Sequence, residues 1–232
     1  MKKQSKKDLF LPTIILYQPQ IGENIGSVAR AMKNCGLYDL RIVKPRDGWP
    51  NPKSLSTAVG AIDLIENAKV CSSLNESLKD ISFIVSTSAR KRFMNKKVED
   101  PSNVSKILLS NYNQKIKSAI IFGPENSGLS NNEISVSDLV MMVPLNKNFS
   151  SLNVSQAVLI IAWEFHKILS NFSLNDKETI SSKKNLQLNL LANFNDRELF
   201  FGRLEKLLDE KKFFPTSQMK PKIMRNIKNV FI

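Results

Sequence analysis

Two short apolar runs in the middle of the chain constrain the fold more than any other feature of the sequence. They occupy residues 118–122 and 139–143, and each is followed at once by Gly-Pro or by Pro. Each run has the length of a buried strand, and the Gly and Pro mark the start of a loop. Polar residues gather in both loops, at 125–128 and at 146–153. Because ligands of open α/β sheets bind beyond the carboxyl ends of adjacent strands, we expect a small-molecule cofactor site there.

The part of the chain before these runs alternates between strand and helix patterns. Strand-like segments occupy residues 13–17, 40–43 and 83–87. Between the first two, apolar residues recur at helical spacing, and we expect Asn24 at the N-cap of that helix and Gly36 at its end. This order predicts an α/β fold that opens with a βαβ unit.

A further helix is expected after the second apolar run, beginning near Ser151. Its broad apolar face consists of Val154, Ala157, Val158, Ile161, Ala162 and Phe165. The sequence Ser-Leu-Asn-Val-Ser opens this helix, so unpaired backbone amides and small hydroxyl groups would face the cofactor site. His166, the only histidine, is expected on the surface at the far end, without a role as general base.

The charge balance favours a polyanionic partner. The 232 residues include 34 Lys and Arg against 21 Asp and Glu, which gives a formal net charge of +13. Such a field attracts nucleic acid most often and an anionic membrane surface less often, although a Lys-rich proteome would give the same composition. Residues 166–232 hold 13 basic and 7 acidic residues, and residues 211–232 hold six basic residues and no acid. The end of the chain therefore suits an arm that faces RNA.

The composition predicts one main domain with a small appendage. We expect a basic tail at residues 1–10, a main domain at 11–169, a polar linker at 170–184 and a helical extension at 185–232. Two amphipathic helices are expected in the extension, marked by Leu199, Leu204, Leu207 and Leu208 and by Met224, Ile227 and Phe231. A segment this short cannot build its own core, so it should dock on the main domain or on a second subunit.

The sequence gives no sign of metal, disulfide or membrane chemistry. Cys35 and Cys71 lie in apolar or mixed segments without Cys-x-x-Cys spacing, so we expect buried thiols in a reducing compartment. One histidine and two dispersed cysteines form no ligand cluster, and no metal is expected. The apolar run near the amino terminus is short and interrupted by Pro12, which does not suit a signal peptide or a membrane span. We expect a cytoplasmic protein without a membrane partner.

Two further features leave alternatives open. Trp49, in a Pro-rich loop, could stack on a base or simply pack onto the domain surface. The basic run Arg90-Lys91-Arg92 follows a predicted strand, so it could grip phosphates or be a solvated charge run.

Three segments resemble the signature motifs of the SpoU (TrmH) family of SPOUT RNA 2′-O-ribose methyltransferases. They are Asn24 to Arg30, Phe122 to Leu129, and Val143 to Ala157, in the family's order and at appropriate separations. The resemblance covers roughly residues 11–165. Within the family, Thr87-Ser88-Ala89-Arg90 and the segment from Phe213 to Ile227 are most similar to the TrmJ tRNA methyltransferase subgroup.

The resemblance implies a fold, a cofactor and partners. The fold would be a SPOUT-type parallel sheet with helices on both faces and a deep C-terminal trefoil knot, a rare exception to un-knotted topology. S-adenosylmethionine would sit in the knot of a homodimer, and the substrate would be tRNA, at the cytidine or uridine in position 32 of the anticodon stem-loop. By position, the cofactor site would be lined by Thr87, Ser88, Ala89, Gly123, Val143, Ser151 and Leu152.

The resemblance also suggests catalytic residues, and Arg30 is the principal one. A guanidinium stays protonated and is a poor base, so we favour Arg30 pairing with the target phosphate and stabilising the developing oxyanion. Ser151 and Asn153 could hydrogen-bond the ribose, or they could cap a helix. Glu125 is expected to support its loop or to contact the arginine, and Asn24 to cap its helix and orient that loop.

Two other functions stay open at this point. A ribosomal RNA ribose methyltransferase would share the same three motifs. A non-catalytic RNA-binding member of the family is the second alternative, and the presence of Arg30, Glu125 and Ser151 argues against it.

Overall fold

A computed structural model describes residues 10–92, 96–175 and 191–231, without the side chains of 173–175. Within these residues, a seven-stranded sheet has the order β3-β2-β1-β6-β4-β7-β5, and every paired strand is parallel to its neighbour. The strands are β1 Thr13–Tyr17, β2 Leu40–Val43, β3 Lys69–Cys71, β4 Phe83–Thr87, β5 Lys97–Glu99, β6 Ser118–Phe122 and β7 Leu139–Met141. The parallel α/β architecture predicted from the sequence is therefore confirmed.

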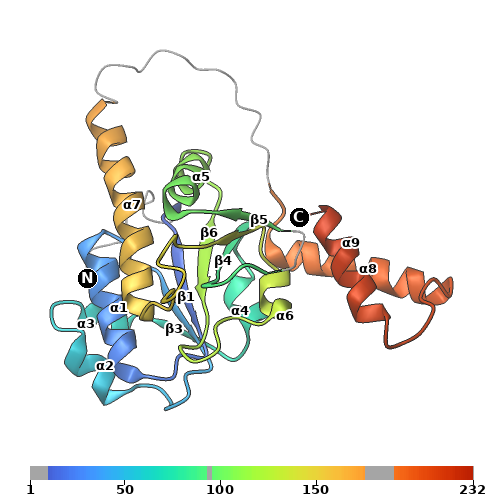
Figure 1. The fold of residues 1–232 in the computed structure, drawn as a ribbon, viewed down its shortest axis with the longest axis horizontal. Helices are drawn as coiled ribbons and strands as arrows, with labels where there is room; N and C mark the ends of the chain where they lie inside the picture. Colours follow the sequence, from blue (N-terminus) through green and yellow to red (C-terminus); the bar gives the residue numbers. More distant parts are fainter. Residues whose placement is uncertain (1–9, 93–95, 176–190, 232) are drawn as a thin grey trace.

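Helices cover both faces of this sheet (Figure 1). They are α1 Gly22–Asn34, α2 Pro52–Thr57, α3 Ile62–Glu66, α4 Leu74–Leu78, α5 Pro101–Asn113, α6 Asn131–Ser135, α7 Val154–Asn175, α8 Phe194–Glu210 and α9 Lys220–Phe231. One face carries α1, α5 and α7, where α7 packs against both α1 and α5, and the other carries α4 and α6. The helices on both faces were expected, and the predicted knot stays a prediction.

Successive residues of each central strand enter opposite cores. In β6, Ile120 and Phe122 belong to the core under α1, α5 and α7, whereas Ala119 and Ile121 belong to the core under α4 and α6. Because both faces are buried, the strands are continuous apolar runs without polar alternation. This is why the two runs in the middle of the sequence were recognisable as strands.

The register brings the carboxyl ends of four strands to one edge of the sheet. Strand β6 lies between β1 and β4, where Phe122 pairs with Leu16 and Ile121 pairs with Ser86. Thr87 in turn pairs with Met141 at the end of β7. The loops that follow β1, β4, β6 and β7 therefore start side by side, although the sequence separates them widely.

The start of α1 differs from the prediction. The helix begins at Gly22 with Ile21 at the N-cap, so the expected N-cap role of Asn24 is wrong. Asn24 lies in the first turn, and its side chain bonds to two other loops instead of to its own helix. The predicted stop is confirmed, because Gly36 follows the helix with a φ of 75° that suits glycine.

The long helix α7 is shifted along the chain relative to the prediction. It starts at Val154, three residues beyond Ser151, because the side chain of Asn153 accepts a 2.8 Å hydrogen bond from the Ser155 amide and caps the helix. Ser151 is left in the preceding loop. The helix ends at Asn175, so residues 170–175 of the predicted linker are helical, and 176–184 lie outside the described residues, as do 1–9 of the predicted tail.

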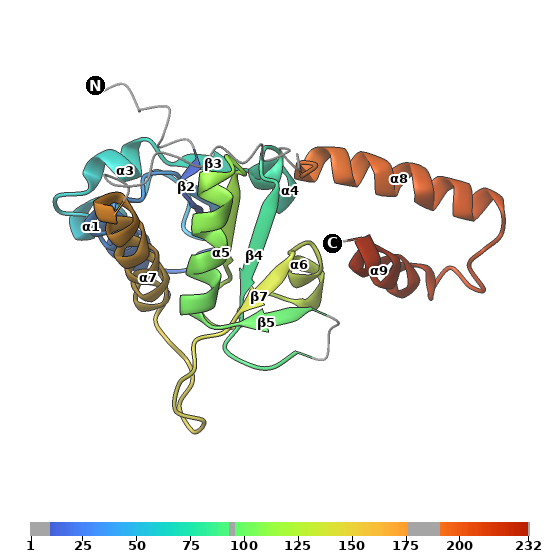
Figure 2. The same cartoon turned by 90° about the horizontal axis from the view of Figure 1, so that it is seen from above.

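The helical extension is attached to the main domain through the start of α8 (Figure 2). The Phe194 amide donates a 2.7 Å hydrogen bond to the Ile81 carbonyl, and Arg197 forms a 2.8 Å ion pair with Asp138. The buried residues of α8 are Phe194 and Phe201, whereas Leu199 and Leu207 are each 56% exposed. Of the leucines that marked this helix, Leu199 and Leu207 are therefore exposed and Leu204 and Leu208 are half-buried, and Phe194 is the residue that joins the core of the main domain.

Three smaller expectations can also be compared with the structure. Both cysteines are free and buried, as predicted. Trp49 is partly buried against the core, which favours the packing alternative over base stacking. His166 is partly buried instead of lying on the surface, and its Nδ1 lies 3.2 Å from the Cys35 carbonyl oxygen.

Candidate active site

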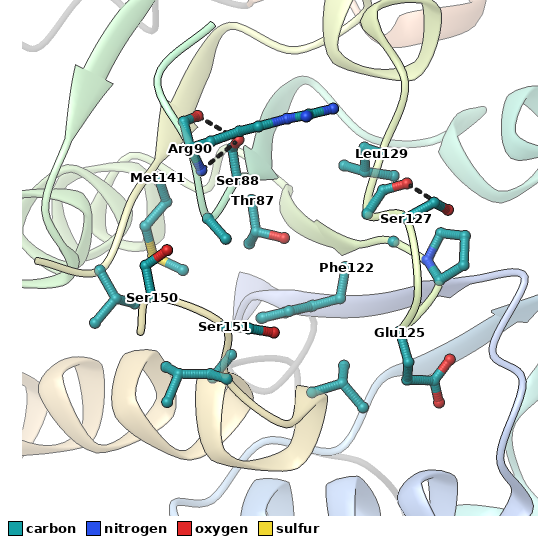
Figure 3. A pocket seen from close by; sticks show the side chains of 18 of the residues that line it. Thr87, Ser88, Arg90, Phe122, Glu125, Ser127, Leu129, Met141, Ser150 and Ser151 are labelled. Carbon is teal, nitrogen blue, oxygen red and sulfur yellow. Dashed lines mark hydrogen bonds between the residues drawn. The ribbon is translucent and has the colours of Figure 1, made fainter. Parts of the chain in front are cut away.

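A pocket of about 350 Å³ lies at the edge where the carboxyl ends of β4, β6 and β7 meet (Figure 3). Its walls come from the loops after these strands and from the first turn of α7. The lining residues are Thr87, Ser88, Ala89, Arg90, Arg92, Phe122, Gly123, Pro124, Glu125, Asn126, Ser127, Gly128, Leu129, Met141, Val143, Leu145, Ser150, Ser151, Leu152, Val154 and Ala157. The predicted position of the cofactor site, beyond the ends of the two apolar runs, coincides with this pocket.

All seven residues predicted to line the cofactor site are in the pocket wall. Two of them also fix the strand ends, since the Thr87 hydroxyl donates to the Ile121 carbonyl at 2.9 Å and the Ser88 amide donates to the Met141 carbonyl at 3.0 Å. These bonds hold the β4 loop against both neighbouring strands. The structure thus brings the predicted residues together, and their contact with a cofactor stays a prediction.

Gly123 allows the loop after β6 to fold back on itself. A Cβ at this position would lie 2.4 Å from the Leu129 amide nitrogen and 2.6 Å from the Gly128 carbonyl carbon, both of which are backbone atoms. Gly128 closes the turn by donating to the Pro124 carbonyl at 2.8 Å, with a φ of 64°. The two glycines therefore shape one wall of the pocket.

Glu125 joins the first two motifs through its carboxylate. One oxygen accepts a 2.8 Å hydrogen bond from the Gln20 amide, and the other accepts a 2.9 Å bond from the side-chain amide of Asn24. The side-chain oxygen of Asn24 accepts a 2.8 Å hydrogen bond from the Asn153 side-chain amide, which brings in the third motif. Glu125, Asn24 and Asn153 thus form a positioning network that holds the three motif loops in register.

Ser151 has the most direct access to the pocket among the predicted catalytic residues. Its side chain is directed toward the cavity between Phe122 and Ser150 (Figure 3). In the described part of the chain its hydroxyl forms no hydrogen bond, so it is available to a ligand. Asn153, in contrast, uses its side chain to cap α7 and to reach Asn24.

Arg30 does not line the pocket of its own chain. It is exposed on α1, six residues beyond Asn24, which places it about 9 Å further along the helix. Among the described residues its guanidinium has no ion-pair or hydrogen-bond partner. The structure therefore does not bring Arg30 together with Ser151 within one chain.

The basic run after β4 divides into two roles. Arg92 donates a 2.7 Å hydrogen bond to the Leu129 carbonyl and a 3.3 Å bond to Asn131, so it ties the β4 loop to the β6 loop. Burial and the charge of Arg90 lower the pKa of Arg92 below its ordinary value. Arg90 itself is exposed at the pocket rim and is free to meet an anion. Arg92 thus fits neither alternative, because it joins two loops, and phosphate binding by Arg90 stays a prediction.

Sequence reasoning missed the apolar part of the wall. Leu129, Met141, Leu145 and Val154 all line the pocket. Leu129 directly follows the motif glycine Gly128, and Leu145 directly follows Pro144. These positions next to motif residues could have indicated that both leucines line the pocket. Among the described residues, no group of three or more His, Cys, Asp or Glu side chains is arranged to hold a metal ion.

These features define the class of protein. A parallel α/β sheet carries a pocket with polar and apolar walls at its carboxyl edge, and side-chain hydrogen bonds through Asn24 tie together the motif loops that form it. Residues 12–163 match the SpoU rRNA methylase family. The chain belongs to this family and is a methyltransferase, as its motifs predicted.

The chain is similar to two relatives over most of its length. It is 30% identical over 210 residues to "tRNA (cytidine-2′-O-)-methyltransferase TrmJ" of Methanocaldococcus jannaschii, covering 88% of this chain and 87% of the relative. It is 37% identical over 164 residues to "Uncharacterized tRNA/rRNA methyltransferase LasT" of Escherichia coli, covering 71% and 72%.

A solved structure shares the fold as well. The crystal structure of TrmJ from Z. mobilis has a TM-score of 0.81 and 35% identity, covering 94% of this chain and 89% of that one. The resemblance to the TrmJ subgroup is therefore confirmed. In the described ranges of the present chain, none of the helices has the length and apolar character required to cross a bilayer.

Proposed function

We propose that this chain is an S-adenosylmethionine-dependent methyltransferase that modifies the ribose 2′-hydroxyl of tRNA, at the cytidine or uridine in position 32 of the anticodon loop. The observation that carries the proposal is the convergence of all seven predicted cofactor-site residues on one pocket. The substrate class is supported by the TrmJ relatives, one of which is named as a tRNA cytidine 2′-O-methyltransferase.

The pocket fits a nucleoside that carries an amino-acid chain. Apolar side chains such as Phe122, Leu129 and Leu145 suit an adenine ring, and Thr87, Ser88 and Ser151 add hydroxyl groups beside backbone amides and carbonyls. Bound S-adenosylmethionine supplies an electrophilic sulfonium methyl group. The protein then needs to align an RNA 2′-oxygen and to raise its nucleophilicity.

Within this proposal, Arg30 and Ser151 have different tasks. Ser151, free and directed into the pocket, hydrogen-bonds the ribose and orients the 2′-hydroxyl. Arg30 pairs with the phosphate of the target nucleotide and stabilises oxyanion character on the attacking oxygen. Glu125, Asn24 and Asn153 act through the loops that they hold. The proton of the 2′-hydroxyl leaves to the phosphate or to solvent.

A homodimer would complete this site. Arg30 does not line the pocket of its own chain, so a second copy is the natural source of that guanidinium. Large apolar side chains are exposed on the helices next to Arg30, namely Ile21 at the start of α1 and Leu159 and Trp163 on α7, with Trp163 55% exposed. Burial of this surface against a second copy would stabilise the pair. The knot expected from the family resemblance belongs to the same proposal.

The remaining parts of the chain serve RNA binding in this proposal. Residues 11–169 form the catalytic domain, and residues 185–232 form a basic extension that docks beside α4 and contacts tRNA. The cell compartment is the cytoplasm, where tRNA is modified. Ribosomal RNA is the second substrate candidate, and it is favoured by the family description and by the tRNA/rRNA wording in the name of the LasT relative.

A methylation assay on separated RNA pools tests the proposal. Purified protein, radiolabelled S-adenosylmethionine and unmodified tRNA should give a ribose methyl that maps to position 32, and an equal amount of unmodified rRNA should give none. Labelling of rRNA alone would replace the proposal by its second candidate. Failure to bind the methyl donor in calorimetry would instead indicate the non-catalytic RNA-binding member.

A further inference from the structure

The connection between β7 and α7 projects from the body of the protein (Figure 2). It spans residues 142–153, and its base forms part of the cofactor pocket through Val143, Leu145, Ser150 and Ser151. Phe149 lies in this connection with 77% of its surface exposed. A large aromatic side chain exposed beside a binding pocket offers apolar area to a partner that reaches the pocket.

The turn around Phe149 is held by hydrogen bonds. The Phe149 amide donates to the Asn146 carbonyl at 3.0 Å, and the Asn148 amide donates to the side-chain oxygen of Asn146 at 2.9 Å. An Asn side chain that accepts from the amide two residues on is a standard way to fix a turn. The aromatic ring is therefore presented by a defined turn and not by a free tail.

Phe149 also stands close to the reacting groups along the chain. Ser150 and Ser151 follow it directly, and both line the pocket. Two residues span at most about 7 Å of backbone, so the Cα of Phe149 lies within about that distance of the Cα of Ser151, the residue that would orient the ribose. Lys147, two residues before Phe149, is exposed in the same turn and adds a cation beside it.

The composition of the turn favours RNA over protein as the partner of Phe149. Asn146, Lys147 and Asn148 directly precede Phe149 in the turn, and all three are exposed. The cores of protein interfaces are depleted in Lys, whereas single-stranded RNA is bound by aromatic rings interspersed with cations and amides. The exposed side chains of α7, Leu159 and Trp163, have the apolar character that a second copy would cover instead.

We propose that Phe149 is the stacking platform for an unpaired nucleobase of the RNA substrate, next to the ribose that is methylated, with Lys147 contacting an adjacent phosphate. The inference rests on the proposed function. Aromatic rings bind single-stranded RNA by stacking on its unpaired bases, and such stacking tolerates any base because every base has a π face.

Steady-state kinetics on tRNA test the proposal. Base stacking on an aromatic ring contributes roughly 1–3 kcal/mol, so Phe149→Ala should raise the KM for tRNA about tenfold or more while kcat changes less. The Kd for S-adenosylmethionine should be unchanged, and Phe149→Tyr should restore the KM. The matched control is Tyr38→Ala, which removes an exposed aromatic ring before β2, at the opposite edge of the sheet.

A direct readout of stacking comes from Phe149→Trp. Its added fluorescence, measured against the unsubstituted protein, should be quenched by an anticodon stem-loop RNA. An unchanged KM in Phe149→Ala, an absence of quenching, or dissociation of a dimer by Phe149→Ala in sedimentation would each overturn the inference. Failure of the proposed function has a different signature, because the unsubstituted protein would then methylate no tRNA.

Discussion

The side-chain amide of Asn153 donates a 2.8 Å hydrogen bond to the side-chain oxygen of Asn24, although 129 positions separate the two residues. Asn24 donates in turn to Glu125 at 2.9 Å. The side-chain amide of Asn24, on α1, therefore joins the loop after β6 to the loop that precedes α7. Because both loops line the pocket, the geometry of the site depends on a residue that does not itself line it.

The first prediction concerns this link. Asn24→Asp keeps the shape of the side chain but places a carboxylate 2.9 Å from an oxygen of Glu125, where a donor is required. The loss of the bond and the repulsion should destabilise the protein by about 1–3 kcal/mol and weaken cofactor binding. Urea unfolding and calorimetry measure both effects. Asn75→Asp, at an exposed position in the first turn of α4, is the control and should change neither.

The second prediction concerns the wall of the pocket. In Gly123→Ala the new Cβ would meet backbone atoms of Leu129 and Gly128 at 2.4 and 2.6 Å, so the loop must move. We expect the Kd for S-adenosylmethionine to rise at least tenfold. The control is Gly202→Ala on α8, where a Cβ meets nothing within 4 Å and the helix should gain about 0.4–1 kcal/mol. Equal cofactor affinity in both variants would contradict the assignment of this wall.

The third prediction concerns Arg30. Arg30→Ala should lower kcat by roughly 10²–10³-fold, because one preorganised donor to a developing oxyanion contributes about that much. The Kd for S-adenosylmethionine should not change, since Arg30 does not line the pocket. Single-turnover methylation and calorimetry separate the two quantities. Arg30→Lys should recover part of the rate, and full activity in Arg30→Ala would remove this residue from the mechanism.

The fourth prediction concerns the basic helix of the extension. In α9, Lys220 pairs with Glu205 and Asp209, and Lys228 pairs with Glu198. Lys222 and Arg225 have no such partner within the described residues. If these two cations contact phosphates, the double variant Lys222→Ala/Arg225→Ala should make the slope of log affinity for tRNA against log salt shallower by about 2.

Binding titrations at several salt concentrations measure that slope. The matched control is Lys69→Ala/Lys79→Ala, which removes two cations from β3 and from the end of α4. An equal change in slope for both double variants would indicate attraction by net charge alone, without a specific role for α9.

The fifth prediction concerns Lys96, whose buried amino group has no hydrogen-bond partner in the described structure. Burial lowers the pKa of Lys96 to about 8. The nearby charge of Arg197 also lowers this pKa, whereas the charge of Asp138 raises it. Below pH 8 the folded state carries the cost of a buried charge, and between pH 8 and about 10.4 the folded state loses its proton before the unfolded state does. The stability contributed by this group therefore rises with pH across that window.

Lys96→Met should accordingly be more stable than the unsubstituted protein at pH 7, by about 1–2 kcal/mol after allowance for solvent screening. This advantage should shrink at pH 9.5. Urea unfolding at the two pH values measures the difference, and Lys91→Met, at an exposed position, should show no pH-dependent gain. An advantage of Lys96→Met that is independent of pH would instead reflect better packing.

Much of the site was predictable because its strands and turns have recognisable local sequence patterns. The runs that became β6 and β7 are apolar on both faces, and the loops after them contain Gly123 and Gly128, whose turn needs glycine. The motif residues of these loops marked the pocket before any contact was known. The short edge strands β3 and β5 were not predicted, since three residues carry too little pattern to separate a strand from a loop.

The sequence by itself determined the α/β architecture, because burial on both strand faces and turn chemistry depend on neighbouring residues. Its three motifs determined the family, and the family resemblance indicated the seven residues that line the pocket. Only the tertiary structure decided that Asn24 bonds to Glu125 and Asn153 instead of capping its helix, and that Phe194 attaches α8 at Ile81. Each of these depends on strand order and register, which bring together residues more than a hundred positions apart, and local propensity carries no information about such contacts.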